Sequence, residues 1–250
     1  MNRGAGSLEF AHARIWARWG ARPDEALWRR IETTRDLAAM LDLARNSALA
    51  RWIDGIGVRS DLHLVDRTMR QRCRDSVAEL CDWMPPDWQP AIAWCATLVD
   101  LPLLQHLARG GAPPAGAADD PVWRKLFDAG AAADPRRHLL DAARRDPQTL
   151  LPLWLAQWRA LLPPGSDRAA VEQGLLPLVE RHLSAFTGPQ TVDGWALRRN
   201  LVERLVLLMR RALVEPVAAF AYLALTALEL ERLRAEIVTR LALPRRSVAP

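Results

Sequence analysis

Apolar residues recur along this chain at intervals of three and four, the spacing that places them on one face of an α-helix. Two long examples are Leu37, Met40, Leu41, Ala44, Ala48 and Trp52, and Leu62, Val65, Met69, Cys73, Val77 and Leu80. No segment of similar length alternates apolar and polar residues with the period of two expected of a half-buried strand. The pattern therefore predicts an all-α protein.

Aspartate–proline pairs and clusters of proline and glycine divide this pattern into segments. Asp120-Pro121, Asp134-Pro135 and Asp146-Pro147 each place a capping carboxylate before a proline, which suits the first turn of a helix because its missing N–H costs nothing there. The segments between breaks predict a bundle of roughly ten helices, which can form two or three related helical units. The longer ones are expected near residues 35–53, 61–83, 87–108, 167–186, 191–214 and 216–241.

The stretch from Gly110 to Ala118 is rich in alanine, proline and glycine, a composition typical of a linker. We therefore expect an N-terminal helical unit at residues 1–109, a linker at residues 110–120 and a C-terminal helical unit at residues 121–250. The two units can also pack as one domain.

The chain has 250 residues, half of them hydrophobic, which is enough to form a core without metal or disulfides. Cys73, Cys81 and Cys95 are odd in number and lack CxxC spacing, so we expect reduced thiols in a cytoplasmic protein. No apolar run approaches the roughly 20 residues of a membrane span, and we expect no membrane insertion.

Basic residues exceed acidic ones by 34 to 29, which raises nucleic acid or anionic lipid as possible partners. Acidic residues are interspersed among the arginines, so we expect nucleic-acid binding to be weak and nonspecific. Arg67, Arg70 and Arg74 share one face of a predicted helix. They form either a contact stripe for phosphates or an acidic partner, or an ordinary solvated face.

Motifs for catalysis or for cofactor binding are not evident. Glu9 and His12 make one Glu-x-x-His match, whereas a carboxylate-bridged di-iron bundle uses two such motifs and two further glutamates. The sequence has no GxxxxGK[ST] loop for phosphate and no GxSxG elbow. We therefore expect no catalytic, cofactor or metal site and no small-molecule substrate, and we assign Trp154 and Trp158, an i, i+4 pair, to the core.

Two terminal segments are similar to a known family. The segment from Phe10 to Trp19, FAHARIWARW, followed by WRRIETTRDLAAMLDLARNSALARWIDGI, resembles the N-terminal region of the C-type subunits of the A/V-type rotary ATPases, called d-type in the vacuolar enzyme. Phe10 takes the place of the family's opening aromatic residue, and Ala13-Arg14 that of its Ala-Arg pair. Thr34 to Leu37 matches the start of a later helix.

The C-terminal segment EPVAAFAYLALTALELERLRAEIVTRLALP is similar to the closing helix of that family. Tyr222-Leu223, Glu229 and Leu233-Arg234 match its spacing, whereas Thr226-Ala227 and Glu231-Arg232 depart from it. The resemblance covers about eighty residues at the two ends. Family members are longer and contain three related helical units, so this chain would be a short, divergent relative.

The resemblance implies a non-catalytic coupling protein on the cytoplasmic face of the membrane. Such a protein links the central stalk to the membrane rotor ring in ATP-driven proton or sodium transport, and Arg14, Glu229 and Arg234 become candidate partner contacts. The alternatives are a helical adaptor or nucleic-acid-binding protein that uses the stripe of Arg67, Arg70 and Arg74, and a helical enzyme whose site the sequence does not reveal.

We further expect the first and last helices to meet. On the last helix, Phe220, Leu223, Leu230, Leu233 and Ile237 should be buried, while Glu229, Arg232, Glu236 and Arg240 should face outward. The spacing of these charged residues predicts surface ion pairs between Glu229 and Arg232 and between Glu236 and Arg240.

Overall fold

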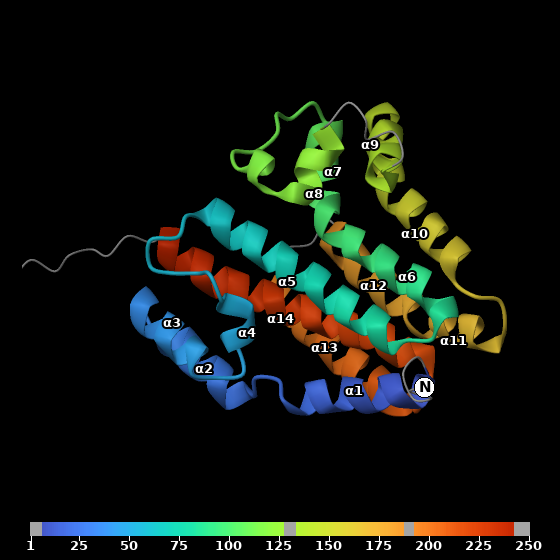
Figure 1. Ribbon diagram of the computed structural model, residues 1–250, viewed down its shortest axis with the longest axis horizontal. Helices are drawn as coiled ribbons and strands as arrows, with labels where there is room; N and C mark the ends of the chain where they lie inside the picture. Colours follow the sequence, from blue (N-terminus) through green and yellow to red (C-terminus); the bar gives the residue numbers. More distant parts are fainter. Residues whose placement is uncertain (1–6, 128–133, 188–192, 243–250) are drawn as a thin grey trace, which may run out of the picture. The chain divides into compact units, whose positions relative to one another are not determined.

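The computed structural model describes residues 7–127, 134–187 and 193–242, and these residues form helices joined by turns, with no strand among them. The protein is all-α, as predicted. The chain divides into two compact units: unit 1 comprises Met1–Pro86 and Pro163–Pro250, and unit 2 comprises Asp87–Leu162. Unit 1 is therefore built from both ends of the chain, and unit 2 from its middle (Figure 1).

Unit 1 contains helices from both segments. They are α1 (Leu8–Gly20), α2 (Glu25–Thr33), α3 (Leu37–Arg45), α4 (Ala50–Ile53), α5 (Leu62–Trp83), α11 (Ser166–Gly174), α12 (Leu176–Thr187), α13 (Gly194–Arg211) and α14 (Pro216–Ala242). Ser7, Asp24, Asp36 and Asp61 cap α1, α2, α3 and α5, because each side chain accepts a hydrogen bond from a backbone N–H of the first turn. These short polar residues therefore fix where four of the helices begin.

Helix α14 packs against α1, α5 and α13. Its Leu230, Leu233 and Ile237 share one hydrophobic cluster with Met40 and Leu41 of α3. Along this helix the five apolar residues expected in the core are all buried: Phe220, Leu223, Leu230, Leu233 and Ile237. The prediction that the first and last helices meet is also confirmed.

Unit 2 consists of shorter elements. They are α6 (Gln89–Trp94), a 3-10 helix (Cys95–Asp100), α7 (Leu101–Ala108), α8 (Pro121–Phe127), α9 (Pro135–Arg145) and α10 (Leu150–Leu161), with single 3-10 turns at Ala117–Asp119 and Pro147–Thr149. Asp134 caps α9 directly before Pro135, and the carboxylate of Asp120 accepts a hydrogen bond from Val122 N at the start of α8. The aspartate–proline pairs therefore mark helix starts, as the sequence indicated.

Buried tryptophans organise the core of unit 2. Trp154 stacks between Trp94 and Trp158, with ring centroids 6.1 and 6.4 Å away, and its indole N–H donates to Thr97 Oγ1 at 2.7 Å. Asp100 is fully buried and accepts from the indole N–H of Trp123 at 2.7 Å and from Arg136 Nε at 2.8 Å. These bonds satisfy polar atoms that would otherwise be costly to bury.

Several predicted helices are interrupted. The segment at 87–108 contains a 3-10 helix at Cys95–Asp100, directly before Pro102. In a regular α-helix the ring of Pro102 would clash with the carbonyl group four residues earlier, and proline has no N–H to donate to it. The segment at 167–186 breaks between Gly174 and Leu176, just ahead of Pro177. The segment at 35–53 divides because the Ser47 hydroxyl donates to Ala44 O and competes with the helical backbone.

The predicted linker at residues 110–120 does not coincide with the observed division, whose boundaries follow Pro86 and Leu162. It lies within unit 2. A local composition of alanine, proline and glycine shows where the chain turns, but not which distant segments pack together.

One helical stretch of the described chain, Pro86–Ala108, has the length and apolar composition of a membrane span, with a mean hydropathy of 1.3 over its most apolar window. Half of that window is buried inside the protein. Core helices of soluble proteins share these properties, so the stretch by itself does not indicate a span.

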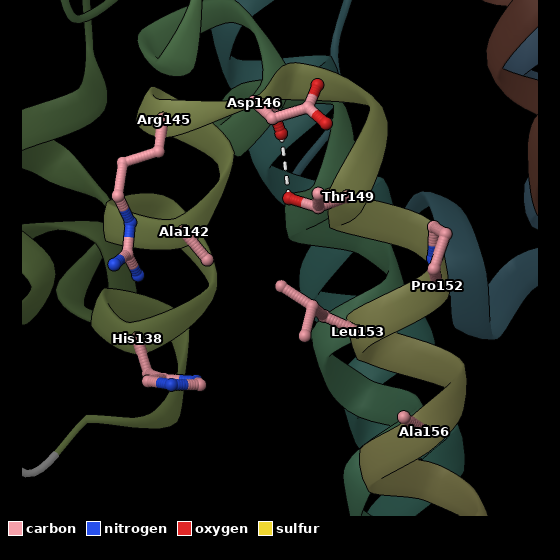
Figure 2. Close-up of a pocket in the computed structure, with 8 residues that line it drawn as sticks. All are labelled: His138, Ala142, Arg145, Asp146, Thr149, Pro152, Leu153 and Ala156. Atoms are coloured by element: carbon pink, nitrogen blue, oxygen red, sulfur yellow. Dashed lines mark hydrogen bonds between the residues drawn. The ribbon is translucent and has the colours of Figure 1, made fainter.

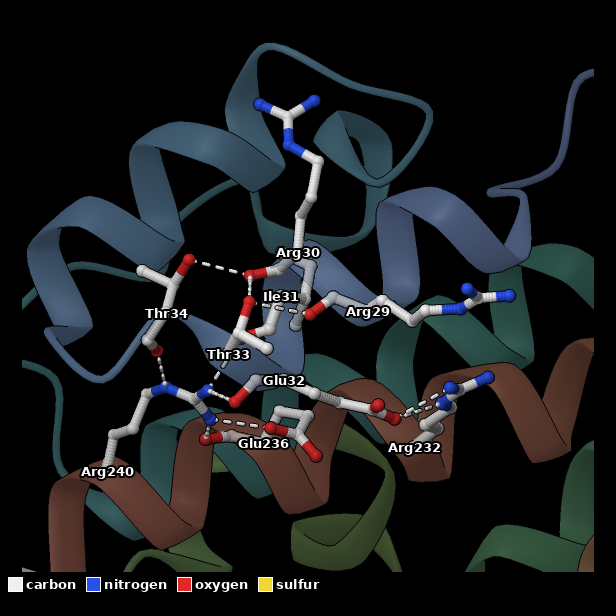
Figure 3. A network of polar contacts seen from close by, with 9 residues as sticks. All are labelled: Arg29, Arg30, Ile31, Glu32, Thr33, Thr34, Arg232, Glu236 and Arg240. Carbon is white, nitrogen blue, oxygen red and sulfur yellow. Dashed lines mark hydrogen bonds and ion pairs between the residues drawn. The ribbon is translucent and has the colours of Figure 1, made fainter.

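Arg240 closes the C-terminal end of α2, as Figure 3 shows. Its guanidinium donates to Thr34 O at 2.8 Å and to Ile31 O at 2.7 Å, and it pairs with Glu236 at 2.7 Å. These carbonyl groups belong to the end of α2, where backbone acceptors have no partner within the helix. A cation is also favoured there by the helix dipole.

The expectation that four charged residues of α14 face outward is wrong. Their side chains are only 8 to 23% exposed: Glu229, Arg232, Glu236 and Arg240. The pair between Glu236 and Arg240 forms as predicted, but Glu229 pairs with Arg22. Arg232 instead binds Glu25 and Glu32 of α2. The outer face of α14 is covered because the short N-terminal helices pack over it.

We predict that Arg240→Gln lowers the free energy of unfolding by roughly 2 to 4 kcal/mol, because it removes several charge-assisted hydrogen bonds from a nearly buried site. Urea unfolding followed by circular dichroism measures this change. Arg30→Gln is the matched control, since the Arg30 side chain points away from the network in Figure 3. Equal stability of the two variants would contradict the capping role.

We also predict that Leu233→Ala lowers the free energy of unfolding by about 2 to 5 kcal/mol, because Leu233 is completely buried where α14 meets the N-terminal helices. The same urea titration measures it. Leu213→Ala provides the control, since Leu213 is 66% exposed. A loss below about 1 kcal/mol for Leu233→Ala would show that this core is loosely packed.

Candidate functional site

Helix α1 and the turn after it carry three arginines at intervals of four residues. Ala11, Ile15 and Trp19 are buried and fix which face of the helix turns inward. Arg14, Arg18 and Arg22 follow the same spacing beside that face and are exposed. Arg51 of α4 lies beside them, because it shares a carboxylate with Arg18. We call Arg14, Arg18, Arg22 and Arg51 the basic row.

Aromatic rings support three of these guanidinium groups. Arg22 lies 3.8 Å from the ring centroid of Trp19, Arg51 lies 5.0 Å from that of Trp52, and Arg14 lies 5.3 Å from that of Trp83. Such stacking is favoured by the negative face of the ring and limits the rotamers that a long side chain samples. The row is therefore partly pre-organised for binding.

The basic row has more guanidinium groups than carboxylates. Glu79 pairs with both Arg18 and Arg51, and Glu229 lies 3.6 Å from Arg22. The ion pairs found in the described part of the chain include none for Arg14, which contacts the rings of Phe10 and Trp83. The excess of positive charge favours a negatively charged partner.

Glu229 is the titratable group of this site. Burial raises the pKa of its carboxyl to about 7, although the positive charges of Arg22, Arg51 and Arg232 act in the opposite direction. The side chain is only 16% exposed, which agrees with desolvation as the dominant cause. A large fraction of Glu229 is therefore protonated near neutral pH, and the positive charge of the row increases when it is.

Of the residues expected to contact a partner, Arg14 belongs to the basic row, and Glu229 is joined to the row by its ion pair with Arg22. Arg234 lies apart from the basic row: it donates from Nε to Asp66 at 2.6 Å and ties α14 to α5. That hydrogen bond is the main cause that raises the pKa of Arg234 above its ordinary value. The side chain of Arg234 therefore joins two helices of unit 1.

The stripe of Arg67, Arg70 and Arg74 is not an open face. Arg74 is 8% exposed, and Arg67 and Arg70 are half-buried. Helix α5 packs against α1, α4 and α14. These neighbours bury more of the surface of α5 than the single face that its apolar residues predict. Arg18, Arg22 and Arg51, which the sequence reasoning missed, are more exposed; the regular spacing of Arg14, Arg18 and Arg22 was the available signal.

Unit 2 contains a groove of about 530 Å³ between α9 and α10 (Figure 2). Its lining is mostly apolar and includes Ala142, Pro152, Leu153 and Ala156, with His138 and Arg145 on the α9 side. Thr149 Oγ1 donates to Asp146 O at 2.7 Å and completes a turn. The polar groups here shape the backbone and do not form a nucleophile with an adjacent base.

Other chemistry receives little support from the residues that the structure describes. They include no group of three or more His, Cys, Asp or Glu side chains arranged to hold a metal ion. Burial, aided by the charge of Asp82, raises the pKa of Cys81 to about 11, so this thiol stays protonated at neutral pH and is a poor nucleophile. His12 accepts a hydrogen bond from the Trp16 indole at 2.8 Å.

Comparison of the chain with protein-family models, with curated proteins and with solved structures gave no match. The functional argument therefore depends on the residues and their geometry.

We predict that the stability of the protein falls between pH 5 and pH 8 relative to that of Glu229→Gln. The folded carboxyl has a pKa of about 7 against an ordinary value of 4.5, so the folded state retains a proton that the unfolded state has lost. Stabilisation by this proton is complete below the unfolded pKa and is lost as the pH rises through 7. Unfolding free energies at several pH values should diverge by as much as about 3 kcal/mol.

Glu231→Gln is the matched control for this measurement, because Glu231 lies on the same helix with its side chain 57% exposed. Its stability should follow the wild-type pH profile. Parallel profiles for Glu229→Gln and wild type would show that the Glu229 carboxyl ionises normally.

Proposed function

We propose that this protein is a non-catalytic coupling protein resembling the C-type, or d-type, subunits of the A/V-type rotary ATPases. In that role it links the central stalk to the membrane rotor ring during ATP-driven proton or sodium transport. One observation carries the proposal: the two terminal segments that resemble the family pack together in one compact unit. That unit contains α1 to α4 and α14.

The packing of the two segments is extensive. Trp28 and Ile31 of α2 lie in the same hydrophobic cluster as Leu233 and Ile237 of α14. Matched residues of the closing helix also contact the N-terminal half, since Glu229 pairs with Arg22. The two segments that resemble the family are distant in the sequence but pack together as one structural unit. This packing supports a shared origin with the family, because two chance similarities would have no reason to lie in contact.

The construction of unit 1 suits the transmission of force. Helix α14 has 27 residues and is roughly 40 Å long. Arg232 connects it to α2 by an ion pair, and Arg234 connects it to α5 in the same way. Arg240 connects it to the end of α2 by a hydrogen bond to a backbone carbonyl. Bonds distributed along a long helix resist bending and sliding, as a coupling element requires.

In this proposal the basic row receives an acidic segment of a stalk or ring protein. Its arginines are exposed at the surface and are oriented by tryptophan rings, which lowers the conformational entropy lost on binding. The row also gives the alternative of a nucleic-acid-binding adaptor a possible surface. The stripe on α5 is less suitable for that alternative, because Arg74 is buried.

We predict that the full chain, tagged in its native host and purified from membranes in mild detergent, carries rotary-ATPase stalk and ring proteins with it. The double variant Arg14→Gln with Arg18→Gln should reduce their recovery by about tenfold, because charge-assisted contacts at the interface are lost. Mass spectrometry of the purified material measures recovery.

Arg29→Gln with Arg30→Gln is the charge-matched control, since these α2 side chains extend away from the polar network in Figure 3. It should retain the partners. Recovery of no rotary-ATPase component by the wild-type chain would refute the proposed function. Normal recovery by the Arg14 and Arg18 variant would instead refute the assignment of the basic row as the contact surface.

A further inference from the structure

The last turns of α13 and the segment that joins it to α14 expose large apolar side chains next to arginines. Leu207, Leu213 and Val214 are 47, 66 and 39% exposed, and Arg210 and Arg211 at the end of α13 are exposed as well. We call these five residues the α13–α14 tip. We propose that the tip binds the surface of a membrane containing anionic lipids.

The exposure of the tip follows from the way the chain turns. Leu205, Met209 and Ala212 are buried and fix the inner face of α13. Leu207 and Arg210 therefore lie toward solvent. The turn is short, because α13 ends at Arg211 and α14 begins at Pro216. Leu213 lies in this turn and stays outside the core.

The backbone of this turn is strained. Val214 has a φ angle of +57°, in the left-handed region that a β-branched residue rarely adopts. Its N–H lies 3.3 Å from Nδ1 of His12, so the turn lies directly beside α1. A glycine or asparagine would satisfy the same turn at lower cost. The apolar side chain at this position therefore indicates a use for it outside the core.

The charge of the tip selects among possible occupants. The ion pairs formed by the described residues include none for Arg210 or Arg211, and these two arginines lie near one exposed carboxylate, Glu215. A second copy of this chain placed symmetrically would bring these arginines against one another. Nucleic acid would use the arginines but not Leu213 and Val214.

An anionic bilayer accepts both kinds of side chain at once. Leucine and valine insert into the boundary between headgroups and acyl chains, and the adjacent arginines remain at the level of the phosphates. Each arginine near such a surface strengthens binding by roughly fivefold at moderate ionic strength. This binding needs no protein partner, so the inference does not depend on the proposed function.

Vesicle flotation tests the proposal with the full-length protein. We expect binding to vesicles of mixed phosphatidylglycerol and phosphatidylcholine, little binding to phosphatidylcholine alone, and a decrease as salt is raised. Leu213→Asp should weaken binding by at least about tenfold, because an inserted apolar group becomes a charge. The separate double variant Arg210→Gln with Arg211→Gln should also weaken binding by at least about tenfold, because two arginines near the phosphates are lost.

Val58→Asp is the matched control, because Val58 is an exposed apolar residue of unit 1 outside the tip, 53% exposed in the turn before α5. It should bind vesicles like wild type, and thermal melts should show that all three variants remain folded. Absence of binding to anionic vesicles, or unchanged binding by both tip variants, would overturn the proposal. A dimer abolished by Leu213→Asp without any vesicle binding would assign the tip to self-association instead.

Discussion

Burial of α14 by helices from both ends of the chain is the interaction on which unit 1 depends. Residues 216–223 are buried on every side, as expected of a helix in the interior of a protein. Farther along, Leu230, Leu233 and Ile237 form a single apolar face against the N-terminal helices. Without α14, the apolar residues of α2 and α3 would lack a partner of sufficient size to remain folded.

Arginine joins these helices where apolar contact ends. Arg232 stacks 4.5 Å from the ring centroid of Trp28 while it binds Glu25 and Glu32. Arg240 donates to three backbone carbonyl groups, two within α2 and one at Thr34, the residue after that helix. A planar guanidinium with five donors can make such divergent contacts, and a lysine ammonium cannot. A lysine therefore could not replace arginine at these two positions without loss of contacts.

The helical class and the positions of several helix starts were predictable, because they depend on local spacing and on capping residues such as Asp61 and Asp134. The division into units was not, because it depends on which distant segments pack together. The sequence pattern places Arg74 and Arg240 in solvent for a related reason. Hydrophobic periodicity identifies one buried face, whereas a helix enclosed by several neighbours also buries polar positions, which then find carboxylates or carbonyls.

The same limit applies to the candidate site. Arg14 and Glu229 follow from a resemblance, but their companions come from α1, from the turn after it and from α4. Arg18 and Arg51 become neighbours through Glu79 of α5, and Arg22 joins the site through Glu229 of α14. Glu229 in particular looks like an ordinary surface glutamate in the sequence. Its raised pKa arises from burial that only the assembled helices create.

The insertion of unit 2 between the halves of unit 1 has a consequence for how the chain acquires its structure. During synthesis α1 to α5 emerge first, yet their main packing partner follows after unit 2 has been completed. Unit 2 is continuous in sequence and can collapse locally, whereas unit 1 must close a long loop before its core forms. The N-terminal helices therefore pass through a period with exposed apolar faces, when they are open to chaperones or to a partner that binds before folding is complete.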